Sequence, residues 1–156
     1  SYPVEAVETL DRIARRVERE YDTRALLLEP PSPLLRDPSA TAISRSACLL
    51  AHDLEARLIV ATTVSGSTAR VLARLRPPLP VVALTPDLAV HRQLTLSWGV
   101  LPATTATFGD TDTLFELVRS ACRDRGLAAP GERVVITAGL PLATRGTTNL
   151  VRVIEV

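Results

Sequence analysis

The feature that most constrains this chain is a series of short apolar segments separated by stretches with helical periodicity. The apolar segments have the length of strands and cover residues 58–61, 81–84, 100–103, 134–137 and 150–156. Between them, the spacing of apolar residues predicts helices over residues 68–75, 87–96 and 113–125. Alternation of strand and helix favours a largely parallel sheet covered by helices on both faces.

The last apolar segment differs from the others in how it is connected. Only a short loop around Arg145 and Gly146 separates it from the preceding segment. Because such a loop leaves no room for a crossover helix, we expect residues 150–156 to run antiparallel to their neighbour.

In the first third of the chain, the sequence predicts two further helices. One covers residues 4–21, where apolar residues form a single stripe and arginines occupy the other, solvated face. Three prolines then indicate a loop over residues 29–33. The second helix begins at residues 37–39 and runs to about Leu54, and its expected buried side carries Ile43, Ala47, Leu50, Ala51 and Leu54.

Length and composition limit the possible functions. The chain has 156 residues, 46% of them hydrophobic, which fits one domain over residues 1–156 and excludes disorder. A net charge of +1 argues against nucleic-acid and acidic-membrane partners and favours small ones. All 18 basic residues are Arg, which excludes a Schiff-base lysine. No apolar run approaches the roughly 18 residues of a membrane span, so we expect a cytoplasmic protein.

Neither catalysis nor metal binding is indicated by the usual residue types. Cys48 and Cys122 lie in apolar helical patterns without a neighbouring His or Cys, so we interpret them as buried core thiols. His52 and His91 lie in helical stretches without a paired nucleophile motif. We therefore expect no catalytic residue and no metal site.

The most informative segment is a turn that follows the apolar segment 58–61. It contains Gly66 and four hydroxyl residues before a helix: Thr63, Ser65, Ser67 and Thr68. Free amides at a helix start attract phosphate, Gly66 permits close backbone approach, and hydroxyls can donate further bonds. The alternative is that the hydroxyls simply cap the helix.

A second loop, residues 139–149, follows a strand that should end at the same edge of the sheet. Its Arg145 could reach an anion bound at the turn. The alternative is an ordinary connection with an exposed Arg.

Nine short motifs in order and spacing show that the chain resembles the C-terminal domain of pyruvate kinases over essentially its whole length. They are YPVEAV (2–7), TAIS (41–44), SG (65–66), RLRP (74–77), VALTP (82–86), WGV (98–100), PGE (130–132), VITAG (135–139) and GTTN (146–149). The resemblance implies a three-layer α/β/α fold with a five-stranded mixed sheet whose last strand is antiparallel.

The resemblance also implies a site for an effector phosphate. The phosphate contacts it carries over are Thr63, Ser65, Gly66, Ser67 and Thr68, and the loop over residues 140–146, with Arg145 and Gly146, would close over the ligand. The chain has Val64 where relatives that bind fructose 1,6-bisphosphate often have Lys, and Leu114 near the position of an Arg.

These departures favour AMP or a sugar monophosphate, such as ribose 5-phosphate or glucose 6-phosphate, over the bisphosphate. Arg70 or Arg145 could substitute for the missing charges, and loss of effector binding is the other possibility.

The resemblance implies a regulatory domain without the catalytic barrel, so this chain alone should not be an enzyme. The parent would be the phosphotransferase of glycolysis, a homotetramer using Mg and K ions, with no cofactor in this domain. An opening on Ser1 and the absence of Met favour a segment of a longer protein, although initiator removal gives the same start.

Two alternatives remain open. The first is a structural or oligomerisation module that pairs through the strand 150–156. The second is a free-standing protein or enzyme with a phosphorylated ligand.

Overall fold

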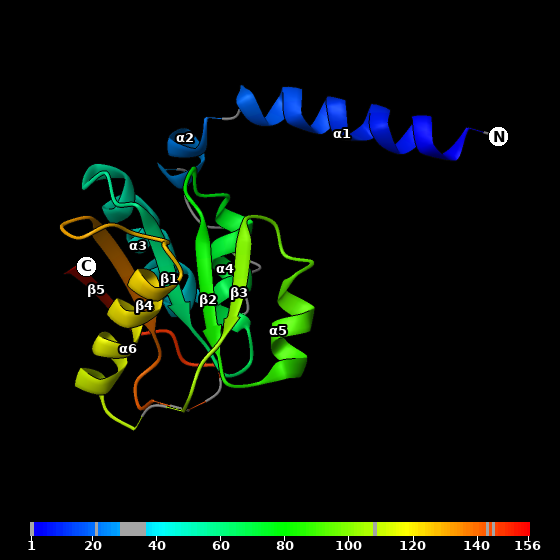
Figure 1. Ribbon diagram of the computed structural model, residues 1–156. Coiled ribbons are helices and arrows are strands. Elements are labelled where there is room, and N and C mark those ends of the chain that lie inside the picture. The colour runs from blue at the N-terminus through cyan, green and yellow to red at the C-terminus, as the bar shows by residue number, and fades with distance from the viewer. Residues whose placement is uncertain (1, 21, 29–36, 108, 143, 145) are drawn as a thin grey trace.

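The computed structural model describes the chain except residues 1, 21, 29–36, 108, 143 and 145 (Figure 1). The helices are α1 (Pro3–Arg19), α2 (Thr23–Leu28), α3 (Pro38–Asp53), α4 (Ser67–Leu75), α5 (Leu88–Leu94) and α6 (Thr111–Asp124). The strands are β1 (Leu58–Thr62), β2 (Val81–Thr85), β3 (Val100–Thr104), β4 (Arg133–Ala138) and β5 (Leu150–Glu155). The short helix α2 was not predicted, and the predicted proline loop lies outside the described residues.

The five strands form one mixed sheet in the order β3-β2-β1-β4-β5. The first four are parallel to one another, and β5 pairs antiparallel with β4. The prediction of an antiparallel last strand is therefore confirmed. In the parallel part, the carboxyl ends of β1 and β4 lie at one edge of the sheet, where both candidate loops begin.

The sheet is covered on both faces, because successive side chains of a strand point to opposite sides. Ile59 and Ala61 pack with α2, α3, α4 and α5 on one face. Leu58 and Val60 pack with α6 on the other. In Figure 1, α6 lies in front of the sheet and α3 and α4 lie behind it. The predicted three-layer arrangement is confirmed, with an unequal number of helices on the two faces.

The buried side of α3 differs from the prediction. Ala47 and Ala51 are fully buried as expected, but Ile43, Leu50 and Leu54 are only partly buried. The deepest positions are instead occupied by small side chains, namely Ala40, Thr41, Ser44, Ala47, Cys48 and Ala51. Small residues let the helix backbone lie close to its neighbours. This close approach depends on tertiary packing, so the spacing of apolar residues in the sequence does not predict it.

Both cysteines are buried free thiols, as predicted. Burial raises the pKa of the Cys48 thiol to about 12. It raises the pKa of the Cys122 thiol as well. Since the thiolate is the reactive form, both side chains are neutral packing groups at physiological pH.

Helix α1 extends away from the sheet, as Figure 1 shows. It has no buried residue. Its apolar stripe is therefore open to solvent, with exposed fractions of 56–66% for Val4, Val7, Leu10, Ile13 and Val17. The predicted helix is present, but the described part of the chain offers no surface that covers its apolar side.

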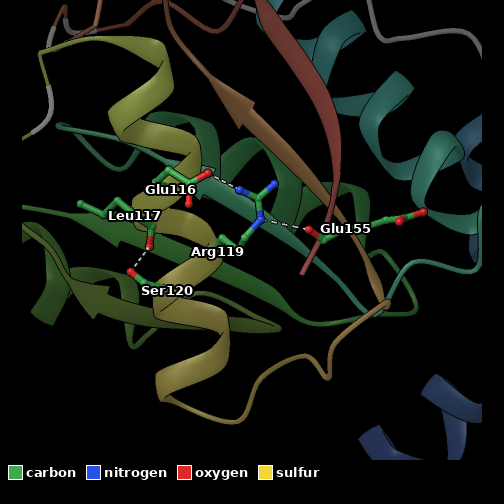
Figure 2. A network of polar contacts seen from close by, with 5 residues as sticks. All are labelled: Glu116, Leu117, Arg119, Ser120 and Glu155. Atoms are coloured by element: carbon green, nitrogen blue, oxygen red, sulfur yellow. Dashed lines mark hydrogen bonds and ion pairs between the residues drawn. The ribbon is translucent and has the colours of Figure 1, made fainter.

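Helix α6 is tied to the edge strand β5 by the polar contacts in Figure 2. Arg119 donates from Nε to the backbone oxygen of Glu155 over 3.1 Å and forms an ion pair with Glu116. Arg152 of β5 stacks over the Phe115 ring at 4.2 Å. These contacts hold the last strand against α6. Among the described residues, no helix is long and apolar enough to span a membrane.

Candidate functional site

The turn between β1 and α4 is built around Gly66. Gly66 lies in the left-handed region at a φ of +79°, and a Cβ there would approach both Arg70 Nη1 and Val90 to 3.1 Å. The amide of Gly66 donates to Thr63 Oγ1 at 2.8 Å, which closes the turn. Glycine is required here because the backbone conformation and the lack of space both disfavour a side chain.

Helix α4 begins without a side-chain cap, unlike its neighbours. Asp37, Asp87 and Asp110 accept bonds from first-turn amides of α3, α5 and α6. At α4 the N-cap is Gly66, and no side chain of a described residue accepts from the first turn. The hydroxyls around Gly66 therefore do not act as caps, so the capping alternative is wrong. The free amides of this turn remain available to an acceptor.

The hydroxyls of the turn keep protons that no described residue accepts. Ser65 Oγ donates to Ser67 Oγ at 3.0 Å. Thr63 is 6% exposed and accepts from Gly66, while no described residue accepts its own proton. The turn therefore presents hydrogen-bond donors that an anion can use.

Arg70 holds the turn by hydrogen bonds. Its Nη1 donates to the backbone oxygen of Ser65 at 2.9 Å, and its Nη2 donates to Gln93 Oε1 at 2.8 Å. The guanidinium is thus already engaged with the turn and with α5. Arg70 does not line the cavity described below, although it donates to Ser65, which does.

The loop between β4 and β5 has a closed neck. Asn149 accepts from the amide of Leu140 and donates to its carbonyl, both at 2.7 Å. A Cβ on Gly139 would lie 2.0 Å from the backbone oxygen of Thr147, so only glycine fits there. This pairing brings the two ends of the loop together directly beside the β1–α4 turn.

Turn and loop meet at a buried pair of hydroxyls and enclose a small cavity. Thr68 Oγ1 lies 2.7 Å from Thr148 Oγ1. The cavity has a volume of about 20 Å³. Its lining consists of Thr62, Thr63, Val64, Ser65, Ser67, Thr68, Gly139, Leu142, Thr144, Gly146 and Thr147. The prediction that both segments meet at one edge is therefore confirmed.

The predicted site residues lie in this cavity with two exceptions. Thr63, Ser65, Ser67, Thr68 and Gly146 line it. Gly66 forms the bend of the turn without lining the cavity, and Arg145 lies outside the described residues.

Several lining residues were not predicted, among them Thr62, Gly139 and Thr147. Gly139 and Thr147 belong to the VITAG and GTTN motifs, but their use in closing the loop depends on contacts across the loop. The motifs alone carried no information about that geometry.

Val64 and Leu114 replace the basic residues that relatives binding fructose 1,6-bisphosphate often have, and the two positions have different surroundings. Val64 lines the cavity, so a Lys at this position would stand beside the ligand. Leu114 belongs to α6 and is fully buried on the side of that helix that packs against the sheet. Among the described residues, the cavity lining contains neither a basic nor an acidic side chain.

A larger cavity of about 690 Å³ lies at the opposite edge of the sheet, beside the end of α1. Its polar groups already bind one another. Glu18 Oε1 accepts from Trp98 Nε1 at 2.7 Å and pairs with Arg76 at 3.3 Å, and Arg76 stacks on the Trp98 ring at 4.8 Å. In the described part of the chain, no group of three or more His, Cys, Asp or Glu residues is arranged to hold a metal ion.

The chain matches the family model for the pyruvate kinase alpha/beta domain over residues 41–154. It is 40% identical to a pyruvate kinase of Clostridium acetobutylicum over 153 residues, which is 98% of this chain and 32% of that protein. It is 41% identical to a pyruvate kinase of Methylorubrum extorquens over 156 residues, 97% of this chain and 32% of that protein.

A crystal structure of a pyruvate kinase from Cryptosporidium parvum has the same fold, with a TM-score of 0.76 at 24% identity over 99% of this chain and 30% of that one. The chain thus spans about a third of the length of the curated relatives, at 32% for the first of them. On the family match and these identities, the chain belongs to the pyruvate kinase family and corresponds to its alpha/beta domain.

Proposed function

We propose that the chain is a regulatory domain that binds a phosphorylated effector at the β1–α4 turn. The observation that carries this proposal is the uncapped start of α4, whose first residues, Ser67 and Thr68, line a cavity with further hydroxyls and with no carboxylate among the described residues. Amides at a helix start carry a partial positive charge and suit a phosphate.

A single phosphate fits the described residues better than two. The turn supplies donors for one anion, whereas Val64 supplies no cation beside it and Leu114 is buried in the core. AMP, ribose 5-phosphate or glucose 6-phosphate is therefore the proposed ligand class, in preference to fructose 1,6-bisphosphate.

Ligand binding requires the loop over residues 140–146 to move. A cavity of about 20 Å³ has room for about one water molecule, so it is too small for a phosphate group. The neck of the loop is held by Asn149 and Gly139, so we expect Leu142, Thr144 and Gly146 to move away from the turn while the neck stays in place.

We further propose that this chain alone does not catalyse. Among the described residues, the lining of the cavity includes no His, Cys, Asp, Glu or Lys to transfer a proton or act as a nucleophile. Regulation would then act on a catalytic barrel, and any Mg or K ions would belong to that barrel. The barrel is the proposed partner whose activity would change when the effector binds.

Calorimetric titration with AMP, ribose 5-phosphate, glucose 6-phosphate and fructose 1,6-bisphosphate tests the effector proposal. At least one monophosphate should give saturable heat, and Ser65→Asp should abolish it. A carboxylate about 4 Å from a phosphate costs roughly 4 kcal/mol at an effective dielectric constant of about 20.

Ser46→Asp is the matched control, because it places the same charge on an exposed position of α3 and should leave binding unchanged. Absence of heat with all four ligands, or equal binding by the Ser65→Asp variant, would refute the proposal.

A contribution to subunit assembly is the second candidate function, and it is compatible with the first. The exposed apolar stripe of α1 favours it, as does the free edge of β5. Assembly into a homotetramer would cover both surfaces. If none of the four ligands gives heat in the titrations, assembly without effector binding is the function that we propose instead.

A further inference from the structure

The hydroxyl pair Thr68–Thr148 carries one proton more than the described residues accept. The two oxygens lie 2.7 Å apart, and the geometry allows either to be the donor. Each hydroxyl has one proton, and one bond between them uses only one of the two. No other described residue bonds to either side chain, and Thr68 and Thr148 are 2% and 4% exposed. A buried hydrogen-bond donor is therefore left without an acceptor.

The position of the cavity decides which of the two protons a ligand can use. Thr68 lines the cavity and Thr148 does not. An anion in the cavity would therefore take the proton of Thr68. That is possible without breaking the pair only if Thr148 donates to Thr68 while Thr68 donates to the anion. The bond between the two hydroxyls then has a defined direction in the bound state.

We propose that Thr148 is a positioning residue of the effector site that holds the Thr68 hydroxyl as a donor to the phosphate. This inference rests on the proposed phosphate site. Without Thr148, the Thr68 hydroxyl is free to turn toward a backbone carbonyl, as Thr side chains near helix starts commonly do. The Thr68 hydroxyl then no longer donates its proton to the ligand.

The same pair connects the two segments of the site. Thr68 belongs to the first turn of α4, and Thr148 lies 80 residues later at the end of the β4–β5 loop. Thr147, its neighbour, touches Gly139 across the neck of that loop. Binding of a phosphate by Thr68 therefore orients a hydroxyl at the end of the β4–β5 loop.

Titration of five variants, one of them a double variant, with AMP and with inorganic phosphate as the minimal ligand tests the role of Thr148. Thr148→Val should weaken binding roughly three- to tenfold, the range expected for one hydrogen bond. Thr148→Ser keeps the hydroxyl and should restore the affinity. In a Thr68→Val background, Thr148→Val should have no further effect, because it acts only through Thr68. Thr85→Val, a buried threonine that does not line the cavity, should bind like the unchanged chain.

Thermal unfolding of each variant separates binding from folding. A loss of affinity that Thr148→Ser does not restore, or that persists undiminished in the Thr68→Val background, would show a purely structural role and overturn the inference. Unchanged affinity of a folded Thr148→Val variant would overturn it as well, while leaving the effector site intact. If the unchanged chain binds neither ligand, the proposed site fails, and the role of Thr148 fails with it.

Discussion

At the scale of single residues, the site depends on two glycines. Gly66 forms the turn at a positive φ and Gly139 forms the neck of the loop, and an added Cβ would come within 3.1 Å of neighbouring atoms at Gly66 and within 2.0 Å at Gly139. The two positions differ in what they contact. The nearest atoms to Gly66 belong to the side chains of Arg70 and Val90, whereas Gly139 lies against the backbone of Thr147. The loop neck is therefore the less adaptable of the two.

Gly139→Ala should open the neck of the loop and destabilise the chain by about 1–3 kcal/mol, the usual range for overpacking. The added Cβ would meet the Thr147 oxygen at 2.0 Å, so the backbone must shift. Chemical denaturation measures the loss. Gly109→Ala is the control, since no atom lies within 4 Å of its Cβ position, and its free energy of unfolding should change by less than about 0.5 kcal/mol. Equal stabilities of the two variants would contradict the close contact.

At the scale of elements, α1 is attached to the rest of the chain through its last turn. Glu18 contacts Arg76 and Trp98, and the remainder of the helix is exposed. The side chains of this ion pair are 42% and 41% exposed, so it contributes no more than about 1 kcal/mol. We therefore expect the orientation of α1 to respond readily to a partner that covers its apolar stripe.

Glu18→Ala should loosen this attachment and make Trp98 more accessible to water. Trp98 is the only tryptophan, so its emission reports on this contact alone. The emission should shift to the red and become easier to quench with iodide. Glu8→Ala removes the same charge from an exposed position on α1 and should leave the emission unchanged. Identical spectra for both variants would mean that Glu18 does not hold the helix.

At the scale of the whole molecule, two features that no described residue covers lie on different elements. Helix α1 has an apolar stripe without a described cover, and β5 has a free edge whose strand is held by α6 (Figures 1 and 2). Covering the α1 stripe would bury more apolar area per residue than pairing at the β5 edge, because strand pairing would form mainly backbone hydrogen bonds. Assembly is therefore expected to depend strongly on α1.

Leu10→Asp should weaken self-association by roughly ten- to a hundredfold, because burial of one Leu side chain is worth about 1.5–3 kcal/mol. Sedimentation velocity over a range of concentrations measures this change. Thr9→Asp introduces the same charge on the polar side of α1 and serves as the control. A chain that stays monomeric at high concentration would count against assembly through this domain, and an unaffected oligomer of Leu10→Asp would exclude α1 from the interface.

The order of elements, the mixed sheet and its antiparallel last strand followed from the sequence, because periodicity and loop length are local properties. The meeting of the β1–α4 turn and the β4–β5 loop followed as well, since parallel strands bring their carboxyl ends to one edge. Thr63, Ser65, Ser67, Thr68 and Gly146 line one cavity for this reason, and their contact with a phosphate stays a prediction.

The remaining features depend on contacts between residues far apart in the chain, which only the tertiary structure decided. The sequence predicted the apolar stripe of α1, and the packing of the other elements leaves that stripe uncovered. The hydroxyls around Gly66 predicted either capping or anion binding, and the backbone geometry of the turn leaves the α4 amides uncapped. Thr68 and Thr148 meet because strand pairing brings the loop neck to the start of α4, and no local pattern contains that contact.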